Sequence, residues 1–379
     1  MRKIIAFLLV MISMAMSAND GVYYTSGNQL VPLKETNISV KKEVLTIWLQ
    51  DDGMAKVDVY YEFNNPESTA KTVLMGFEAD PSYNDDYTLY VDGNHPHIKD
   101  FTVEINGEKI GYKNAISDVT AFSPLDMKKW ELDEYGLYLV RKDGTGQIDN
   151  YAYVYYFNAT FKPGLNKIHH TYLYTMSASV SQAFSVPYKL SPAARWANGQ
   201  IDDFTLYICA ENTAKHFYVN AEALQDMMPR LEGPFTKVRP KTYYEQNMWE
   251  IALRNSKVKF HKKNYTPKPE QELSIGSADG DKVYESTARF GEFYDRSSTL
   301  CLALWKFTED REQKLSDEML QRIARNLPYA NRGRIFKNKE IQKYMESLWW
   351  YMPDPNYNDD TSDFTSQDWE YIKYDPKNE

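Results

Sequence analysis

The most regular feature of the chain is an alternation of apolar and polar residues that begins near Ile38. Apolar side chains occupy every second position from Leu45 to Leu49 and again from Val57 to Phe63, on the two sides of an Asp-Asp-Gly turn. A period of two is typical of antiparallel strands that bury one face. About a dozen such segments, separated by turn residues at short spacing, follow one another as far as Phe260. The pattern therefore predicts an antiparallel β-sandwich.

One of the predicted strands, from Tyr151 to Phe161, is unusually rich in aromatic residues. Most of its alternate positions carry tyrosine or phenylalanine, so that large rings would lie on one face of the strand. A protein core is the usual place for such a face, although sugars also stack on aromatic rings. Before this strand, Ser123 to Trp130 is predicted to be a short helix, with Ser123 as its cap and Pro124 at its first position.

The spacing of the apolar residues changes near the C-terminus. From Ser316 to Leu327 they recur at helical intervals, and the Ser316 hydroxyl is suited to accept hydrogen bonds from the first backbone N–H groups. Pro328 lacks an N–H group and is expected to end or kink this helix. A second amphipathic helix is predicted after Asn338, and the two apolar stripes are expected to pack on each other. The aromatic run Trp349-Trp350-Tyr351 should then close the open end of the pair.

The segment between the two predicted helices carries a motif. It reads Tyr-Ala-Asn-Arg-Gly from Tyr329 to Gly333 and resembles the YARHG domain, an extracellular module of bacterial proteins. Asn331 stands in place of the family's arginine and Arg332 in place of its histidine, so no role that depends on that histidine is carried over. The resemblance implies a location outside the cytoplasm and no established catalytic chemistry. The candidate binding residues at and around this motif, in part structural, are Arg325, Asn326, Tyr329, Arg332, Gly333, Phe336, Trp350 and Tyr351.

A second resemblance concerns the β region. The run from Val57 to Pro66, together with Phe161-Lys162-Pro163-Gly164 and Tyr172, is similar to an uncharacterised secreted bacterial domain. This resemblance implies no activity.

The N-terminus has the features of a secretory signal peptide. Arg2 and Lys3 precede an apolar run from Ile4 to Met16, and small residues follow at positions 17 and 18. The run is too short to span a bilayer permanently, and no long apolar run occurs after it. We therefore expect an exported protein, periplasmic or extracellular, with no transmembrane segment in the mature chain.

These features together predict an α+β protein, in which a large antiparallel β-sandwich region precedes a small C-terminal helical domain. The signal peptide would comprise residues 1–18, and the β-sandwich region residues 19–275, as one large or two small sandwiches. A linker over residues 276–296 would lead to the helical YARHG-like domain with an acidic tail, residues 297–379.

The charge of the chain limits its partners. Removal of the signal peptide with Arg2 and Lys3 takes the formal net charge from −9 to −11. Phosphate binding needs a compensating basic surface, so nucleic acid is not an expected partner. The arginines near the motif, such as Arg322 and Arg334, are interpreted as a solvated helix face.

The chain has two cysteines, Cys209 and Cys301. An oxidising compartment allows them to pair, and the bridge would tie the C-terminal domain to the β region. Two separate buried thiols are the alternative.

The sequence shows no recognised catalytic set. It lacks the nucleophile elbow G-x-S-x-G, the zinc-protease motif H-E-x-x-H and a phosphate-binding glycine loop. The two imidazoles of His95-Pro96-His97 fall short of the three or four ligands that zinc requires, and neither a metal nor a cofactor is expected. Trp196, in a predicted loop between Arg195 and Asn198, is a candidate for stacking against a ligand.

The export signal and the aromatic content favour a non-catalytic binding protein of the cell envelope, with a protein or a glycan as its ligand. A hydrolase of envelope polysaccharide or peptide is the alternative, and it requires a deep cleft with two carboxylates of perturbed pKa. An assembly factor that pairs through a free sheet edge is a third possibility.

Overall fold

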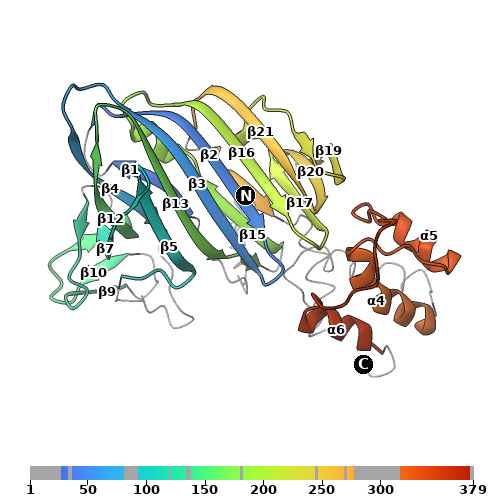
Figure 1. The fold of residues 1–379 in the computed structure, drawn as a ribbon. Coiled ribbons are helices and arrows are strands. Elements are labelled where there is room, and N and C mark those ends of the chain that lie inside the picture. Colours follow the sequence, from blue (N-terminus) through green and yellow to red (C-terminus); the bar gives the residue numbers. More distant parts are fainter. Residues whose placement is uncertain are drawn as a thin grey trace, which may run out of the picture.

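The computed structural model describes residues 27–32, 36–80, 93–118, 120, 122–133, 138–179, 182–243, 246–268, 271–276 and 316–375. Within these ranges two large β-sheets precede a group of C-terminal helices (Figure 1). The predicted α+β class, with a sandwich region followed by a small helical domain, is confirmed. No helix in the described ranges is both long enough and apolar enough to cross a membrane.

The first large sheet has eight strands, and its longest members are those with the clearest alternation. Every second residue is buried in β2 from Glu43 onward and in β3 from Ala55 onward, and Gly53, at a φ of +78°, lies in the turn between the two strands. The period of two places one side of each strand in the core and leaves the other side outward. The strands, in spatial order, are β18 (Arg230–Glu232), β21 (Ser256–Tyr265), β16 (Ile201–Ala210), β2 (Ser39–Leu49), β3 (Met54–Asn65), β13 (Gly164–Thr175), β5 (Ile98–Ile105) and β6 (Glu108–Lys109).

The second large sheet has eleven strands and lies behind the first (Figure 1). Ten of its strands, in spatial order, are β19 (Phe235–Tyr243), β20 (Gln246–Arg254), β17 (Lys215–Asn220), β22 (Leu273–Gly276), β15 (Gln182–Lys189), β1 (Gly27–Pro32), β4 (Lys71–Ala79), β12 (Tyr151–Phe161), β7 (Lys113–Asp118) and β8 (Ser123–Pro124). The eleventh, β14 (Ser177–Ser179), pairs with β15. A small sheet is formed by β11 (Gln147–Ile148), β10 (Leu139–Arg141) and β9 (Trp130–Leu132).

Two strand pairs are parallel rather than antiparallel. They are β16 with β2 and β1 with β15. A hydrophobic period of two reports which face of a strand is buried but carries no information about its direction, so the sequence pattern did not reveal these pairs.

Aromatic side chains from both sheets fill the space between them. Phe63 of β3 meets Phe161 of β12 with ring centroids 5.6 Å apart, and the aromatic face of β12 is buried as the core interpretation predicts. Trp196 lies 4.5 Å from Phe63 and is only 3% exposed. The expectation that Trp196 stacks against a ligand is therefore wrong, because its ring is part of this core.

The segment from Ser123 to Trp130 does not form the predicted helix. Ser123 and Pro124 make the short strand β8, which pairs with the end of β7, and Trp130 begins β9. Pairing along an existing sheet edge here outweighs the local capping signal, as tertiary context often does.

The helices within the described ranges are η1 (Ser191–Arg195), α1 (Ala221–Leu224), α4 (Asp317–Asn331), α5 (Lys339–Ser347) and α6 (Ser366–Lys373). α4 and α5 begin where the sequence predicts, because Ser316 accepts from the Met319 N–H and Asn338 accepts from two N–H groups of the first turn of α5. Pro328 lies within α4 and does not end it. One missing N–H group near the C-terminus of a helix removes a single hydrogen bond, and the buried ring stays in the helix.

The acidic tail contains a further helix that the sequence interpretation missed. α6 begins with a capping box in which Thr365 and Asp368 satisfy each other's backbone N–H groups. It packs along α4, and Tyr371 is fully buried between them and the rest of the domain. The tail is thus a folded part of the C-terminal domain as far as residue 375.

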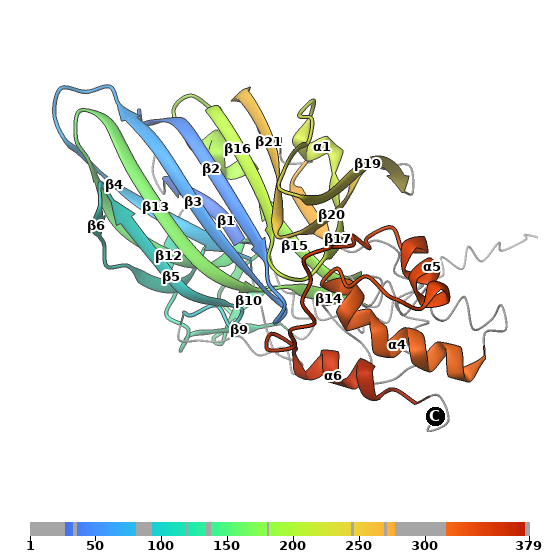
Figure 2. The same cartoon turned by 45° about the vertical axis from the view of Figure 1, so that its right-hand side comes forward.

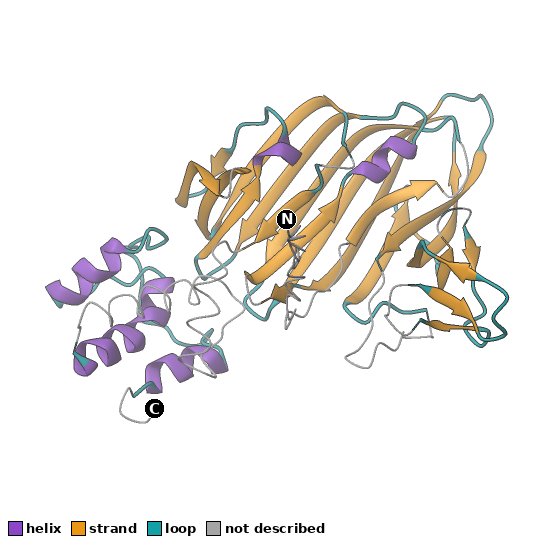
Figure 3. Ribbon diagram, turned by 180° about the vertical axis from the view of Figure 1, so that it is seen from behind, coloured by secondary structure: helices purple, strands orange, loops and turns teal. Residues whose placement is uncertain are grey.

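The C-terminal helices lie beside the β19–β20–β17 end of the second sheet (Figure 2). Figure 3 shows them, in purple, gathered at one end of the sandwich. The Ala214 N–H donates to the carbonyl of Asn331 at 3.0 Å, and Ala252 of β20 belongs to the same apolar cluster as Leu327 and Trp350. The domain therefore shares a core with the sheet edge.

Candidate functional site

Arg332, which follows α4, holds the C-terminal helices together. Its side chain is 4% exposed, and it binds the carboxylates of Asp363 at 3.0 Å and Asp368 at 2.9 Å. It also donates to the carbonyl of Pro328 and lies over the ring of Phe364, 4.2 Å from the ring centre. Burial would lower the pKa of Arg332, but the two carboxylates outweigh burial and raise it. The residue at the family's histidine position is thus an interior ion-pair partner.

Gly333 lies where Arg254 of β20 crosses the C-terminal domain. The backbone φ of Gly333 is +93°, and a Cβ atom there would lie 2.6 Å from the Arg254 Nη2. The same guanidinium donates to the carbonyl of Met352 at 3.0 Å and pairs with Asp354 at 3.4 Å. Glycine is required at this position both for its positive φ and for the close approach of the arginine.

Two further cations, on β19, hold the aromatic segment after α5. The Lys237 ammonium donates to the carbonyls of Trp349 and Tyr351, each at 2.8 Å. Burial lowers the pKa of Lys237. Arg239 lies over the ring of Trp349, 4.6 Å from its centre. Hydrogen bonds from a charged donor contribute about 1.5–3 kcal/mol each, so Lys237 is a principal attachment of the domain.

Arg239 is held in place by Glu250, a buried carboxylate of β20. Glu250 accepts from Arg239 at 2.5 Å, from Tyr218 at 3.1 Å, and is 3.0 Å from the His216 Nε2. Burial would raise the pKa of Glu250, but the hydrogen bonds from His216 and Arg239 lower it to about 2. The cluster is a structural support beneath Trp349 and is occupied by its own ion pairs.

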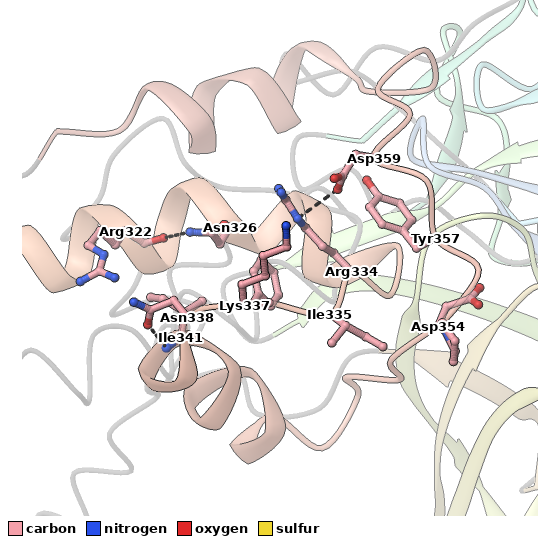
Figure 4. Close-up of a pocket in the computed structure, with 12 residues that line it drawn as sticks. Arg322, Asn326, Arg334, Ile335, Lys337, Asn338, Ile341, Asp354, Tyr357 and Asp359 are labelled. Atoms are coloured by element: carbon pink, nitrogen blue, oxygen red, sulfur yellow. Dashed lines mark hydrogen bonds and ion pairs between the residues drawn. The ribbon is translucent and has the colours of Figure 1, made fainter.

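Beside this attachment the C-terminal domain has a cleft of about 470 Å³ (Figure 4). It lies between α4, the segment that leads into α5, and the loop after residue 353. Its lining combines cations with an apolar wall. The lining residues are Arg322, Asn326, Arg334, Ile335, Phe336, Lys337, Asn338, Ile341, Asp354, Pro355, Tyr357 and Asp359.

The cations of the cleft differ in how they are paired. Arg334 pairs with Asp359 at 3.0 Å, whereas Arg322 is 3.8 Å from Glu340. Lys337 is exposed and forms no ion pair with any residue in the described ranges. The cleft therefore offers one uncommitted ammonium and one loosely held guanidinium, a combination that suits an anionic or carbonyl group of a ligand.

Apolar and capping groups complete the cleft. Ile335 is 49% exposed and presents an apolar side chain to the cleft. Asn338 is committed to the cap of α5, and the Asn326 amide donates to the Arg322 carbonyl at 2.6 Å. Burial, with a smaller effect of Asp359, raises the pKa of Tyr357 to about 12. Tyr357 is therefore a neutral phenol at physiological pH.

The structure distributes the predicted motif residues over two roles. Asn326 and Phe336 line the cleft, whereas Arg325 is exposed and outside its lining. The remaining motif residues either contact a cleft residue or lie buried in the domain. Tyr329 lies under Arg334, the Tyr351 hydroxyl donates to the Arg334 carbonyl at 2.6 Å, and Trp350, Arg332 and Gly333 are buried.

Sequence reasoning missed Arg322, Arg334 and Lys337 as cleft residues. The clustering of arginines near the motif was the available signal, but it does not distinguish a concave surface from a solvated helix face. The neighbouring acidic positions Asp354 and Asp359 belong to a loop whose course depends on contacts with β20.

The cysteine prediction lies partly outside the described residues. Cys209 is a buried thiol in β16, and burial raises its pKa to about 11, whereas Cys301 falls outside the described ranges. The two imidazoles of His95 and His97 are packed in the sandwich region, where burial lowers their pKa values to about 3 and about 4. In the described ranges no three His, Cys, Asp or Glu side chains form a metal-binding group.

Comparison with protein families gives one match in each part of the chain. Residues 300–378 match the YARHG domain, and residues 18–141 match a domain of unknown function, DUF4424. The helices that build the cleft are thus those of a YARHG domain, in agreement with the motif around Tyr329. None of the curated proteins compared with the chain matches it.

Solved structures resemble the chain at low sequence identity. A crystal structure of a candidate nutrient-binding protein from Legionella pneumophila has a TM-score of 0.50 and 17% identity, and covers 94% of this chain and 98% of that one. An M1 zinc metallopeptidase from Deinococcus radiodurans has a TM-score of 0.26 and 9% identity, over 65% and 43% of the two chains. Baculovirus P35 has a TM-score of 0.27 and 11% identity, over 66% and 99%. Only the first likeness indicates a shared fold, and it extends along nearly the whole chain.

Proposed function

We propose that the protein is exported, periplasmic or extracellular, and that it acts there as a non-catalytic binding protein whose ligand occupies the cleft of the YARHG domain. The observation that carries the proposal is the cleft itself, with Lys337, which forms no ion pair with the described residues, the loosely paired Arg322 and the exposed Ile335 around one concavity. The YARHG match supports the location, because the family is typical of extracellular bacterial proteins. The shared fold with a candidate nutrient-binding protein supports the binding role.

The ligand is an envelope protein or glycan that presents an anionic or carbonyl group next to an apolar one. Lys337 and Arg322 would bind the polar group, and Ile335 would contact the apolar part. The walls of the cleft are fixed to the sheet through Lys237 and Arg254, so the ligand meets a preorganised site.

Hydrolysis is less well supported by the same cleft. A glycosidase needs one carboxylate with a raised pKa and a second one free to act as base or nucleophile. Both carboxylates of the cleft are engaged by arginine, Asp354 by Arg254 and Asp359 by Arg334. These ion pairs favour binding over acid–base chemistry.

The proposal is tested by titration of the purified chain with peptidoglycan fragments and fractionated envelope extracts in a calorimeter. Lys337→Glu reverses the uncommitted charge and is expected to weaken binding at least tenfold, because a cation–anion contact becomes a repulsion. Lys343→Glu makes the same charge change on the exposed surface of α5, outside the lining of the cleft, and should leave the affinity unchanged. Absence of binding to every fraction, or equal affinity of the Lys337→Glu and Lys343→Glu variants, would contradict the proposal.

A further inference from the structure

The outer face of the eight-stranded sheet carries a second surface that is independent of the cleft. In Figure 1 this face is turned to the viewer, and none of the described helices lies over it. On β2 the residues Val44, Thr46 and Trp48 point outward, because Leu45, Ile47 and Leu49 between them are buried. The same alternation places Lys257 and Lys259 of β21 and Tyr207 of β16 on the outer face, because Val258, Phe260 and Ile208 next to them are buried.

The strand register places aromatic rings and lysines side by side at one end of this face. Lys257, Cys209, Trp48 and Lys56 follow one another across four neighbouring strands, β21, β16, β2 and β3. In the adjacent row Lys259 is paired with Tyr207. We call Trp48, Lys56, Tyr207, Lys257 and Lys259 the basic strip.

The lysines of the basic strip stay close to its rings. The Lys56 ammonium is 5.4 Å from the centre of the Trp48 ring, and those of Lys257 and Lys259 are 4.6 and 5.5 Å from the centre of the Tyr207 ring. Cation–π attraction of this kind keeps each ammonium group within about 6 Å of a ring centre. Charge and flat apolar surface are therefore presented together.

The basic strip is only partly neutralised. Lys257 pairs with Glu232 at 3.1 Å, and Asp58, in the same row as Lys259, is 3.0 Å from the His169 Nε2. Across the parts of the chain that the structure describes, neither Lys56 nor Lys259 has a carboxylate within ion-pair distance. A net charge of −9 thus coexists with a local positive surface.

We infer that the basic strip binds an anionic polysaccharide of the uronate type. Sugar rings would stack on Trp48 and Tyr207, while the carboxylates would pair with Lys56 and Lys259. The strip spans three strand spacings from β21 to β3, about 14 Å, which accommodates a few sugar units. Such a polymer carries one charge per sugar, a density that a few lysines can match.

The charge density favours this ligand over nucleic acid. Duplex DNA carries one negative charge per about 1.7 Å of its axis, and its binding needs a broad basic surface. The chain has an excess of carboxylates, and those would repel so dense a polyanion beyond the basic strip.

The test measures the affinity of the full chain for alginate, an anionic sugar polymer. Three control polymers are measured beside it: dextran, which has sugar rings but no charge, polyglutamate, which is anionic but has no sugar rings, and duplex DNA, which is a dense polyanion. We expect binding to alginate and affinities at least tenfold weaker for the other three. The double variant Lys56→Glu/Lys259→Glu should weaken alginate binding at least tenfold, and Trp48→Leu, which keeps an apolar cover on the sheet, at least threefold. Lys113→Glu, an exposed position on the other sheet, is the matched charge control and should bind as the wild type does.

Folding of each variant is checked by its thermal unfolding curve, which should match the wild type because the substituted side chains lie on the outer face. The inference is overturned by absence of alginate binding, by equal affinity for polyglutamate or DNA, or by folded strip variants that bind as tightly as Lys113→Glu. The cleft variant Lys337→Glu should bind alginate normally. Its result separates a failure of the basic strip from a failure of the cleft.

Discussion

At Gly333 the backbone has a φ of +93°, and the guanidinium of Arg254 occupies the space next to its Cα. The glycine turn after α4 follows from the sequence alone, because a helix commonly ends in a glycine of positive φ. The arginine does not, since Arg254 is 79 residues away and nothing in its own strand marks it as a contact of the motif. Arg332 is a similar case: its substitution for the family's histidine is visible in the sequence, but its burial between Asp363 and Asp368 is not.

Gly333→Ala should reduce the free energy of unfolding by about 1–3 kcal/mol, through strain at positive φ together with displacement of Arg254. Gly107→Ala is the control, because Gly107 has a φ of +85° but open space around its Cα. Chemical denaturation of both variants separates the two effects. An equal loss of stability in the two variants would show that the close approach of Arg254 is energetically unimportant.

The burial of His170 leads to a prediction of how the stability of the protein depends on pH. It is fully buried in the sandwich, stacked near Tyr61 and Tyr172, and burial, with a smaller effect of His169, lowers its pKa from 6.5 to about 3. The folded state thus keeps His170 neutral while the unfolded chain takes up a proton below pH 6.5. Stability is therefore lost as the pH falls from 6.5 toward 3, by about 2–3 kcal/mol at pH 4.5 for this side chain.

His170→Phe should make the loss of stability between pH 7 and pH 4.5 smaller by about 2–3 kcal/mol, because phenylalanine fills a similar space and does not titrate. The buried His95 and His97 should still contribute to the remaining dependence. Urea unfolding at pH 7 and pH 4.5 measures the difference. His261→Gln, at an exposed position of the same sheet, should keep the wild-type dependence. A dependence on pH that is the same in His170→Phe as in the wild type would refute the assignment.

At the scale of elements, the sequence predicts best where local and tertiary preferences agree. Features that depend on neighbouring residues could be predicted from the sequence. They are the alternation of β2 and β3, the aromatic face of β12 and the caps of α4 and α5. The segment from Ser123 to Trp130 was predicted wrongly because its first residues pair with the edge strand β7. The helix α6 was missed because its apolar face is buried only by packing against α4. The parallel pair β2–β16 joins residues 161 positions apart in sequence, such as Val40 and Ile201, and a hydrophobic period gives no information about pairing over that distance.

The attachment of the aromatic segment to β19 gives a prediction at the same scale. Lys237→Met keeps the aliphatic stem but removes both hydrogen bonds to the carbonyls of Trp349 and Tyr351. The loss of two such hydrogen bonds should weaken the attachment of the domain by about 3 kcal/mol or more, which appears as faster hydrogen exchange in α4, α5 and α6. Lys241→Met, an exposed position on the same strand, serves as control. Unchanged exchange in the Lys237→Met variant would contradict the role of this contact.

The molecule as a whole combines a β-sandwich with a YARHG domain that shares its core. The sequence predicts the presence and order of these parts, and it allows either a disulfide between Cys209 and Cys301 as their link or two separate buried thiols. The structure provides another link through three cations of β19 and β20, namely Lys237, Arg239 and Arg254. Their partners are backbone carbonyls, an aromatic face and one carboxylate. Contacts of this kind have no characteristic residue pattern that could be recognised in the sequence. The cleft could not be predicted for the same reason, since its shape depends on how the domain rests on the sheet.

The most direct measurement of the central claim is hydrogen–deuterium exchange of the full chain with and without the envelope fraction that it binds. If the ligand occupies the cleft, protection should appear in residues 334–341 and in the first half of α4, and should be lost in the Lys337→Glu variant. Exchange in β7 and β12, far from the YARHG domain, should not change. Protection that leaves residues 334–341 untouched, or that persists in Lys337→Glu, would contradict the account.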